Sequence, residues 1–275
     1  MKTGKHTDPV WQVRWQEDKE SKELNFFSIS TDGRVAKWSM TKNELKMEQV
    51  VQLKLAINNF NNEPDEICAG GLAGGCCFDF SMKLDYLFLI GTEEGNIHKC
   101  SKAYSGQYLE TYEGHNMPVY TLKWNAFHEG VFISCSADWT VKIWHHNLKS
   151  PVISFDLGNS VADVCWSPFS STVFAAITSD GKVHVFDLAQ NKHEPLCEQR
   201  VAKRAKLTRI CFNERHPIVI VGDDSGGINS LKLSPNLRKL LDSTSMDGKE
   251  STSAVAQRNK LEKVLASIDI TRKIL

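Results

Sequence analysis

The sequence predicts an all-β fold made of repeated units of short strands, and three observations support this. A run ending SADWTVKIW at Trp144 is echoed by STDGRVAKW at Trp38 and, more weakly, by TSDGKVHVF at Phe186. The acidic residue in the turn of each unit recurs at a nearly constant interval. Short apolar runs alternate with turn residues along the same stretch. Units that recur every forty-odd residues are typical of a β-propeller of the WD-repeat type.

The repeat can be followed through the acidic residue that precedes the third strand of each unit. These turn acids are Asp32, Glu94, Asp138, Asp180 and Asp224, at intervals of 62, 44, 42 and 44 residues. Three of the four intervals match the period of roughly 40–45 residues that a WD repeat requires. The longest interval contains residues 56–75, which are rich in Asn and Gly and are expected to form an insertion loop.

Five blades are therefore expected within a propeller domain that spans residues 1–237. Their cores are predicted at 6–40, 76–100, 115–145, 159–187 and 206–233. No apolar period of 3.6 residues persists through these segments, which argues against helices. Complete propellers close with about four to eight blades, and WD-type rings commonly have seven. We therefore expect a partial ring with exposed strand edges, as in a fragment or a short isoform.

The segment 238–275 departs from the repeat. It begins with a polar stretch, DSTSMDGKESTS, which predicts a linker. Leu261, Val264, Leu265 and Ile268 then follow at helical spacing. Two readings remain open for this last part, a short amphipathic helix and a frayed tail.

Composition narrows the functional classes. Lys plus Arg and Asp plus Glu each number 33, so the net charge is zero and gives no general attraction to nucleic acid or anionic membrane. No stretch resembles a signal peptide or approaches the roughly 20 apolar residues of a membrane span. The eight cysteines show no C-x-x-C spacing. We expect a soluble intracellular chain with reduced thiols and no metal or cofactor.

The residues that best combine into a site are His115, Ser134, Asp138 and Trp144. A His, a Ser and an Asp together suggest a hydrolase triad. A second set, His6, Ser28, Asp32 and Trp38, repeats the spacing, and a catalytic triad would not occur twice in register. The prediction is therefore structural: in each blade a buried hydrogen-bond chain from Asp through His and Ser to Trp, here named the lock. The unit ending at Phe186 retains Asp180 but lacks the Trp and His, so its lock should be weaker.

Two aromatic residues are candidates for contacting a partner. Trp139 occupies the turn position where Gly is usual in these repeats, and Trp11 lies near the start of a first strand. Exposed aromatic residues on propeller surfaces make good anchors for protein partners. The alternative is that each packs against a neighbouring loop.

Other candidate sites are weak. GGLAGG lacks the Lys-Ser/Thr that a phosphate-binding loop requires. His128, His145 and His146 have no partner at metal-ligand spacing, and the basic run 200–209 is expected to be a solvated loop. No catalytic residue is predicted, and the chain is not expected to be an enzyme.

Residues 91–144 carry a more specific signal. The pieces GTEEG, KCSKAY, YLETY, MPVY and SCSADWTVKIW resemble the dynein intermediate chain family, especially the axonemal outer-arm intermediate chain 1 type. The resemblance extends over roughly residues 6–237. It implies a non-catalytic dynein subunit whose propeller docks on a heavy chain, with a second intermediate chain as a further partner. The N-terminal region that binds light chains in this family has no counterpart in the sequence, which leaves light-chain binding in doubt.

The resemblance also implies a place in the cell and leaves alternatives open. An axonemal dynein subunit would lie in the cilium or flagellum, in the cytoplasm and cytoskeleton, and would meet microtubules through the complex. Membrane and nucleic acid are not expected partners. A cytoplasmic dynein intermediate chain serving cargo transport and a generic WD-repeat scaffold are the alternative functions.

Overall fold

The structure of the chain is a computed structural model that describes residues 4–17, 24–40, 44–55, 71–84, 86–104, 107–234, 237 and 250–274. Residues 56–70 of the predicted insertion loop and 238–249 of the predicted linker lie outside this description. Within the described residues, nineteen strands form five antiparallel sheets, followed by one helix. The prediction of an all-β propeller with about five blades is confirmed.

The first two blades are meanders of four strands each, in which neighbouring strands along the chain pair with each other. Blade 1 contains β1 (Val10–Glu17), β2 (Leu24–Ser30), β3 (Arg34–Met40) and β4 (Leu45–Gln52). Blade 2 contains β5 (Gly75–Phe80), β6 (Leu87–Thr92), β7 (Ile97–Ser101) and β8 (Glu110–Tyr112).

The remaining blades repeat this plan. Blade 3 contains β9 (Val119–Trp124), β10 (Val131–Ser136), β11 (Thr140–His145) and β12 (Ile153–Asp156). Blade 4 contains β13 (Val161–Trp166), β14 (Val173–Thr178), β15 (Lys182–Asp187) and β16 (Cys197–Arg200). Blade 5 has three described strands, β17 (Leu207–Phe212), β18 (Ile218–Asp223) and β19 (Ile228–Lys232).

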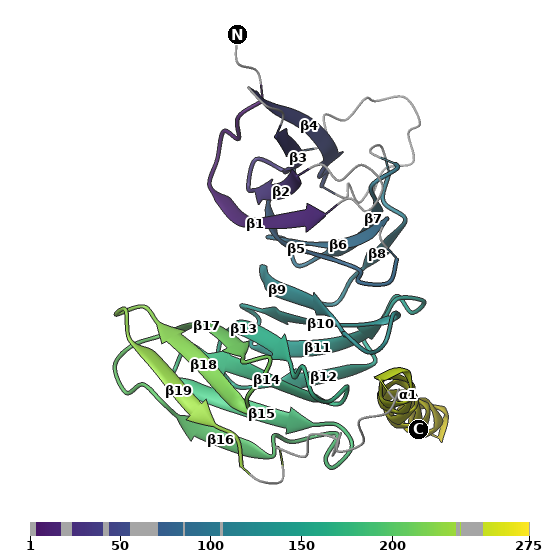
Figure 1. The fold of residues 1–275 in the computed structure, drawn as a ribbon, viewed down its shortest axis with the longest axis vertical. Helices are drawn as coiled ribbons and strands as arrows, with labels where there is room; N and C mark the ends of the chain where they lie inside the picture. The colour runs from purple at the N-terminus through teal and green to yellow at the C-terminus, as the bar shows by residue number, and fades with distance from the viewer. Residues whose placement is uncertain are drawn as a thin grey trace, which may run out of the picture.

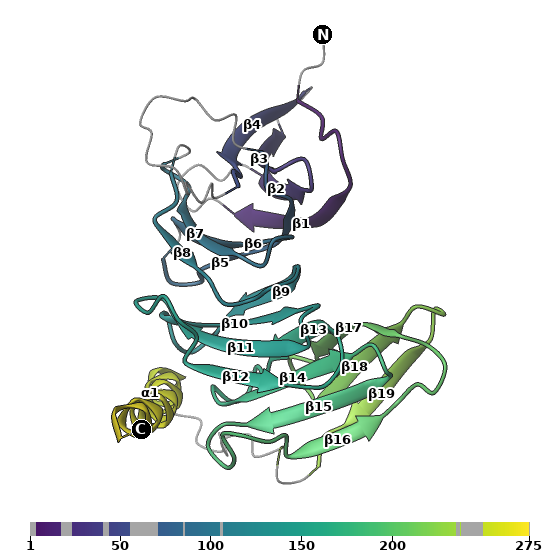
Figure 2. The same ribbon diagram turned by 180° about the vertical axis from the view of Figure 1, so that it is seen from behind.

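The five sheets form an open arc instead of a closed ring. Figures 1 and 2 show blade 1 at one end of the arc and blade 5 at the other, with a gap between them. Consecutive blades touch through their first strands, β5 against β9 and β9 against β13 among them. The arc has two edges, named here the upper rim and the lower rim. The upper rim carries the turns between the second and third strands of each blade, and the lower rim carries the loops between the first and second strands.

Apolar layers between the blades form the core. In blade 3, Phe132 stacks on Trp144 with 6.0 Å between ring centroids. Leu89, Ile97 and Tyr112 of blade 2 cover this pair, and all five side chains are fully buried. Blade 3 thus buries its aromatic face under blade 2, because neither sheet can cover its own apolar surface.

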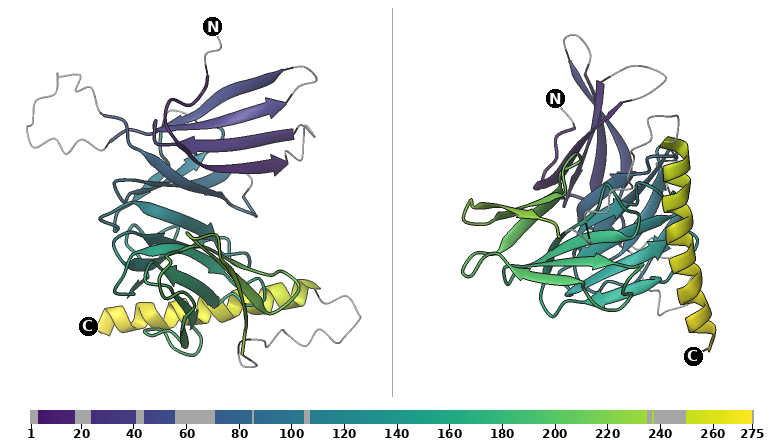
Figure 3. Two further views of the ribbon diagram at one scale, coloured as in Figure 1. Left: turned by 90° about the vertical axis from the view of Figure 1, so that its left-hand side faces the viewer. Right: turned by 60° about the horizontal axis from the view of Figure 1, so that its bottom comes forward.

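A C-terminal helix, α1 (Glu250–Ile274), completes the fold. It lies alongside blades 3 and 4, as Figures 1 and 3 show. Leu261 and Val264 are buried in the apolar layer between these blades, and Leu265 and Ile268 pack against it. The helical spacing of the four residues therefore corresponds to one buried helix face, and the frayed-tail reading is wrong for this segment. No helix among the described residues has the length and apolarity to cross a membrane.

The upper-rim turns need a left-handed backbone at one position in every blade. Gly33, Gly95, Gly181 and Gly226 fill it in four blades with φ between 75° and 95°. Trp139 fills it in blade 3, with φ of 71°. In blade 5 the Asp223 amide bonds the Gly227 carbonyl, as Thr92 bonds Asn96 in blade 2. The turn-acid position of blade 5 is therefore Ser225, and the sequence alignment on Asp224 was wrong by one residue.

Gly181→Ala should destabilise the propeller more than Gly158→Ala. Both glycines have positive φ, but a Cβ at Gly181 would lie 2.0 Å from the Ala202 carbonyl oxygen, whereas a Cβ at Gly158 meets nothing within 4 Å. We expect about 1 kcal/mol for Gly158→Ala, from backbone strain alone, and at least twice that for Gly181→Ala. Urea unfolding measures both. Equal losses would show that the close approach at Gly181 does not exist.

Candidate functional site

The lock of blade 3 is a continuous chain of short hydrogen bonds. Trp144 Nε1 donates to Ser134 Oγ at 2.8 Å, and Ser134 Oγ lies 2.7 Å from His115 Nε2. His115 Nδ1 lies 2.8 Å from Asp138 Oδ2. Every residue in this chain of bonds is buried except Asp138, which is half-buried. The chain ties the loop before β9 to two strands and to the turn between β10 and β11.

The partners determine the tautomer of His115. An indole N–H can only donate, so Ser134 accepts from Trp144 and has its own O–H free to donate to His115 Nε2. The proton of the neutral ring is therefore on Nδ1 and is donated to the Asp138 carboxylate. Every donor in the chain meets an acceptor in this arrangement. The Ser134 hydroxyl and the His115 ring are both used for structure, so they do not form a nucleophile and base open to a substrate.

The carboxylate at the end of the chain fastens the turn itself. Asp138 Oδ1 accepts from the Thr140 amide at 3.1 Å and from its hydroxyl at 2.7 Å, and Oδ2 accepts from the Asn116 amide at 3.2 Å. Burial alone would raise the pKa of Asp138, but hydrogen bonds from His115 and Thr140 outweigh it and hold the pKa well below its usual range. The pKa of His115 is lowered, because desolvation outweighs its bond to Asp138. The pair is neutral imidazole and carboxylate at pH 7.

Blade 1 contains a second lock with the same geometry. Trp38 Nε1 donates to Ser28 Oγ at 2.8 Å, His6 Nε2 lies 2.7 Å from Ser28 Oγ, and His6 Nδ1 lies 3.0 Å from Asp32 Oδ2. Arg34 and the Thr7 amide also bind the Asp32 carboxylate. Desolvation raises the pKa of Asp32, yet these bonds outweigh it and lower the pKa to about 2.

Blade 4 retains only the turn end of the lock. Asp180 accepts from the Thr178 hydroxyl at 2.5 Å and forms ion pairs with Lys182 and Arg200. Ala176 stands where Ser134 stands in blade 3, and Phe186 replaces the Trp. The apolar stack of Phe174 on Phe186 is retained at 4.6 Å. The Thr178 hydroxyl also lies 3.2 Å from His184 Nε2, so a different buried polar chain supports this blade beside the aromatic packing.

Trp139 lies on the upper rim beside other exposed apolar side chains. Its side chain is 53 % exposed, and Met117 and Tyr120 at the same end of blade 3 are 48 % and 43 % exposed. These three residues are named the rim patch. The left-handed backbone at Trp139 costs about 1 kcal/mol or more for a residue with a Cβ. A large exposed side chain held at such a position is a feature of recognition sites.

Trp11 also lies on the upper rim, at a β-bulge. The pairing of β1 with β2 shifts register between Val10 and Gln12, which leaves Trp11 as the extra residue, exposed to solvent. Tyr120 occupies the matching bulge of β9. Bulges reorient side chains at sheet edges and are common beside binding sites. Trp11 and the rim patch lie on different blades.

Sequence reasoning missed an apolar face at the blade 1 end of the arc. Trp15, Phe26 and Trp38 form the same aromatic layer that Trp124, Phe132 and Trp144 form in blade 3. Trp15 is 63 % exposed, whereas Trp124 is 6 % exposed under blade 2. The alternation of Trp11, Val13 and Trp15 in the sequence indicates an apolar face on this strand. Whether that face is exposed depends on whether a neighbouring blade covers it.

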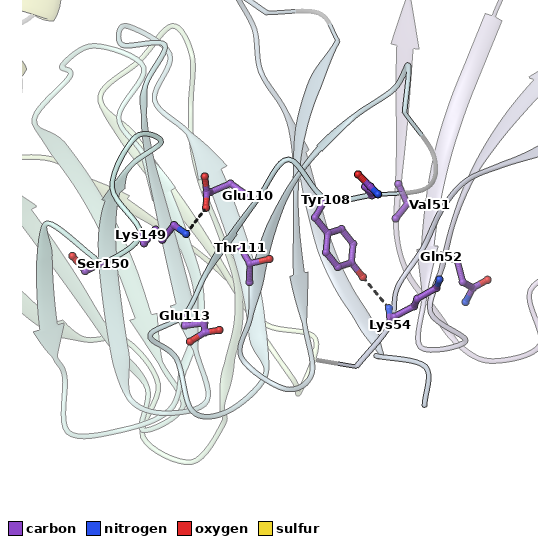
Figure 4. Close-up of a pocket in the computed structure, with 10 residues that line it drawn as sticks. Val51, Gln52, Lys54, Tyr108, Glu110, Thr111, Glu113, Lys149 and Ser150 are labelled. Carbon is purple, nitrogen blue, oxygen red and sulfur yellow. Dashed lines mark hydrogen bonds and ion pairs between the residues drawn. The ribbon is translucent and has the colours of Figure 1, made fainter. Parts of the chain in front are cut away.

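A groove lies between the outer strands of blades 1 and 2 and a loop of blade 3. Its volume is about 860 Å³, and Figure 4 shows the ion pair of Lys149 and Glu110 (3.3 Å) on one side, with Tyr108 and Lys54 on the other. The Tyr108 hydroxyl accepts from the Lys54 amide, and its ring stacks on His98 at 3.9 Å. Among the residues that the structure describes, no three His, Cys, Asp or Glu side chains are placed to hold a metal ion.

Asp138→Ala should destabilise the chain by about 1–3 kcal/mol, since it leaves His115 and the turn amides without their buried acceptor. The matched control is Asp180→Ala in blade 4, whose carboxylate bonds the Thr178 hydroxyl and, among the described residues, has no His or Trp as a direct hydrogen-bond partner. We expect the control to cost less than half as much. Chemical denaturation of both variants measures the difference, and equal losses would contradict a structural role for the full chain of bonds.

The lock should also make stability fall in mild acid. Because the folded-state pKa of His115 is below its unfolded value of about 6.5, its contribution is complete above that pH and is lost as pH falls. The Asp138 contribution has the same sign but is lost only below about pH 4. Unfolding free energy should therefore decline from pH 7 to 5, and His115→Gln should make the decline shallower. Identical slopes for parent and variant would contradict the assignment.

Comparison with known proteins gives the chain its family. Residues 83–233 match the family model of the dynein axonemal intermediate chain 3 WD40 domain. The chain is 60 % identical to "Dynein intermediate chain 2, ciliary" of Heliocidaris crassispina, over 87 % of this chain and 34 % of that protein. It is 51 % identical to "Dynein, 78 kDa intermediate chain, flagellar outer arm" of Chlamydomonas reinhardtii, over 86 % of this chain and 35 % of that protein. The chain thus spans about a third of the length of these relatives.

Solved structures agree on the fold. The WD40 β-propeller domain of Doa1 superposes with a TM-score of 0.62 at 19 % identity, over 83 % of this chain and 66 % of that one. At this identity the likeness bears on the fold alone. The match to the family model covers more than half of the sequence. This chain therefore belongs to the axonemal dynein intermediate chain family, and its five blades are the WD40 part characteristic of that family.

Proposed function

We propose that the chain acts as a non-catalytic subunit of an axonemal outer-arm dynein, which assembles or anchors heavy chains for ciliary and flagellar motility. The single observation behind the proposal is family membership at 60 % identity to a ciliary intermediate chain. The names of the matched relatives place those proteins in cilia and in the flagellar outer arm. The proposed location is accordingly the axoneme.

The proposed partners follow from the same reasoning. Dynein heavy chains are the principal partner, and a second intermediate chain is the next. Contact with microtubules would pass through the complex. Light chains bind a separate N-terminal region in this family, so they are not assigned to the five blades.

Within this function, the rim patch is the proposed docking surface and Trp139 its anchor. Trp is enriched among residues that dominate binding energy, because its large rigid side chain loses little entropy when buried. Trp139 stands at a position that the other four blades give to glycine, so its side chain is retained at a cost to the fold. Met117 and Tyr120 widen the apolar area around it. The locks support docking indirectly, because they hold the turn that presents Trp139.

Trp139→Gly should abolish most capture of dynein heavy chains from ciliary extract, while the free energy of unfolding rises by about 1 kcal/mol because the left-handed strain is relieved. Glycine occupies this position in the turns of the other four blades. A loss of binding therefore cannot be ascribed to a damaged turn. The measurement is affinity capture by the full 275-residue chain, followed by mass spectrometry. Met82→Ala removes another highly exposed apolar side chain, from a loop on the lower rim, and should capture heavy chains like the parent. Undiminished capture by Trp139→Gly would remove Trp139 from the interface. A set of non-dynein partners for the parent would overturn the function itself.

A further inference from the structure

Each blade of the arc has two faces. We call the face toward the preceding blade along the chain the rear face, and the face toward the following blade the front face. At all four junctions inside the arc, a front face packs against a rear face in an apolar layer. Within the described residues, the rear face of blade 1 and the front face of blade 5 have no neighbouring blade, and Figures 1 and 2 show them at the two ends of the arc.

The rear face of blade 1 is exposed at positions that are buried inside the arc. Its first-strand residues are Val10, Val13 and Trp15, which are 44 %, 55 % and 63 % exposed. Both β1 and β9 have a bulge near their start, and matching the strands through it gives counterparts that are 0 %, 1 % and 6 % exposed under blade 2. These counterparts are Val119, Leu122 and Trp124. The rear face of blade 1 is therefore built like an interior surface, and a contiguous apolar area of this kind marks an interaction site.

The front face of blade 5 carries aliphatic side chains at the positions by which blade 2 covers blade 3. Ile228 begins β19 and is 78 % exposed, whereas its counterpart at the start of β7, Ile97, is fully buried. Ile220 of β18 is half-buried, whereas its counterpart in β6, Leu89, is fully buried. Ile97 and Leu89 lie in the apolar layer that contains Trp144. Blade 5 thus presents the side chains that would cover the rear face of a further blade.

The junction between blades 2 and 3 shows what covers a rear face of this composition. There, aliphatic side chains of a front face lie against an aromatic layer. Blade 1 exposes an aromatic layer of the same arrangement, in which Trp15 meets Phe26 edge-on at 5.2 Å and Phe26 stacks on Trp38 at 5.9 Å. Among the described residues, the uncovered front face is that of blade 5, which lies across the gap from blade 1 in the same chain (Figure 1). The surface that matches blade 1 is therefore blade 5 of a second copy.

This pair of faces lacks a polar bond that the inner junctions have. Asp79 Oδ2 of blade 2 accepts from a backbone amide of β9 at 2.8 Å, and Asp163 Oδ2 of blade 4 accepts from a backbone amide of β17 at 3.0 Å. Blade 5 has Cys211 and Arg209 at the two matching positions, and neither supplies a carboxylate. The contact between copies should therefore be reversible and mainly apolar, so its strength should change little with salt.

We infer that the rear face of blade 1 binds the front face of blade 5 of a second copy of this chain, so that copies associate head to tail with these two blades packed as consecutive blades. Such an interface is heterologous: the two copies contribute different faces, and a pair of copies retains one free face of each kind. Further copies can then add, until the ends meet in a ring or the assembly stays open. The interface involves neither the rim patch nor a dynein heavy chain, so it does not rest on the proposed function.

Two variants and their mixture test the inference. Trp15→Asp places a charge on the rear face of blade 1 and leaves blade 5 intact, and Ile228→Asp does the reverse. Both side chains are mostly exposed, so the charge is solvated in a single chain and loses its water only in the interface. In sedimentation velocity, the parent should reach at least about twice the monomer mass as its concentration rises. Each variant alone should associate at least about tenfold more weakly than the parent.

An equal mixture of the two variants should form a dimer and nothing larger. The intact blade 1 of the Ile228→Asp chain can meet the intact blade 5 of the Trp15→Asp chain, and the remaining two faces each carry a charge. Met82→Asp is the matched control, because Met82 is 72 % exposed on the lower rim, and it should associate like the parent. Circular dichroism checks that each chain is folded, and Val13→Asp on the same face replaces Trp15→Asp if that variant does not fold.

The following results would overturn the inference. A parent that stays monomeric at every concentration would show that the two faces do not bind each other. Association of Ile228→Asp alone as strong as that of the parent would mean that blade 1 meets blade 1 of the second copy. Undiminished association of Trp15→Asp would remove blade 1 from the interface. A mixture that stays monomeric, although the parent associates, would place the contact on other surfaces.

Discussion

The chain of hydrogen bonds from Trp144 through Ser134 and His115 to Asp138 is the interaction on which blade 3, the middle blade of the arc, depends. It joins the neighbouring strands β11 and β10, the loop before β9 and the upper-rim turn between β10 and β11. Because these groups are buried, the bonds are expensive to lose even though each contributes modestly when formed. Blade 1 repeats the device, and blades without it rely on aromatic stacking and on their neighbours.

The lock also explains how the turn of blade 3 tolerates Trp139. A residue with a Cβ in the left-handed region persists only when the surrounding structure over-determines the backbone. The Asp138 carboxylate accepts one hydrogen bond from the Asn116 amide, in the loop before β9. It accepts another from the Thr140 amide, directly after the turn. The same carboxylate thus serves the fold directly and the proposed docking surface indirectly.

Much of this could be predicted from sequence, for identifiable physical reasons. The repeat revealed the blades because buried strands and tight turns restrict residue type, and the spacing of Leu261 to Ile268 indicated α1. The one-residue error at Asp224 arose because blade 5 has two consecutive aspartates, Asp223 and Asp224, directly before the turn-acid position, which Ser225 occupies. Which side chains are exposed could not be predicted, since Trp15 and Trp124 occupy equivalent positions and differ only in whether a neighbouring blade covers them. The partner of α1 could not be predicted either, because Gln257 and Ser171 meet through tertiary contact alone.

The central claim is that the lock holds Trp139 in a strained position, and a double-mutant cycle of Asp138→Asn and Trp139→Gly tests it most directly. Releasing the lock lets the turn relax, so the strain that glycine relieves should be present only while Asp138 is intact. Urea unfolding of the four chains should give a coupling free energy of about 1 kcal/mol, with Trp139→Gly more favourable in the parent than in Asp138→Asn. Additive effects, with no coupling beyond error, would contradict the account.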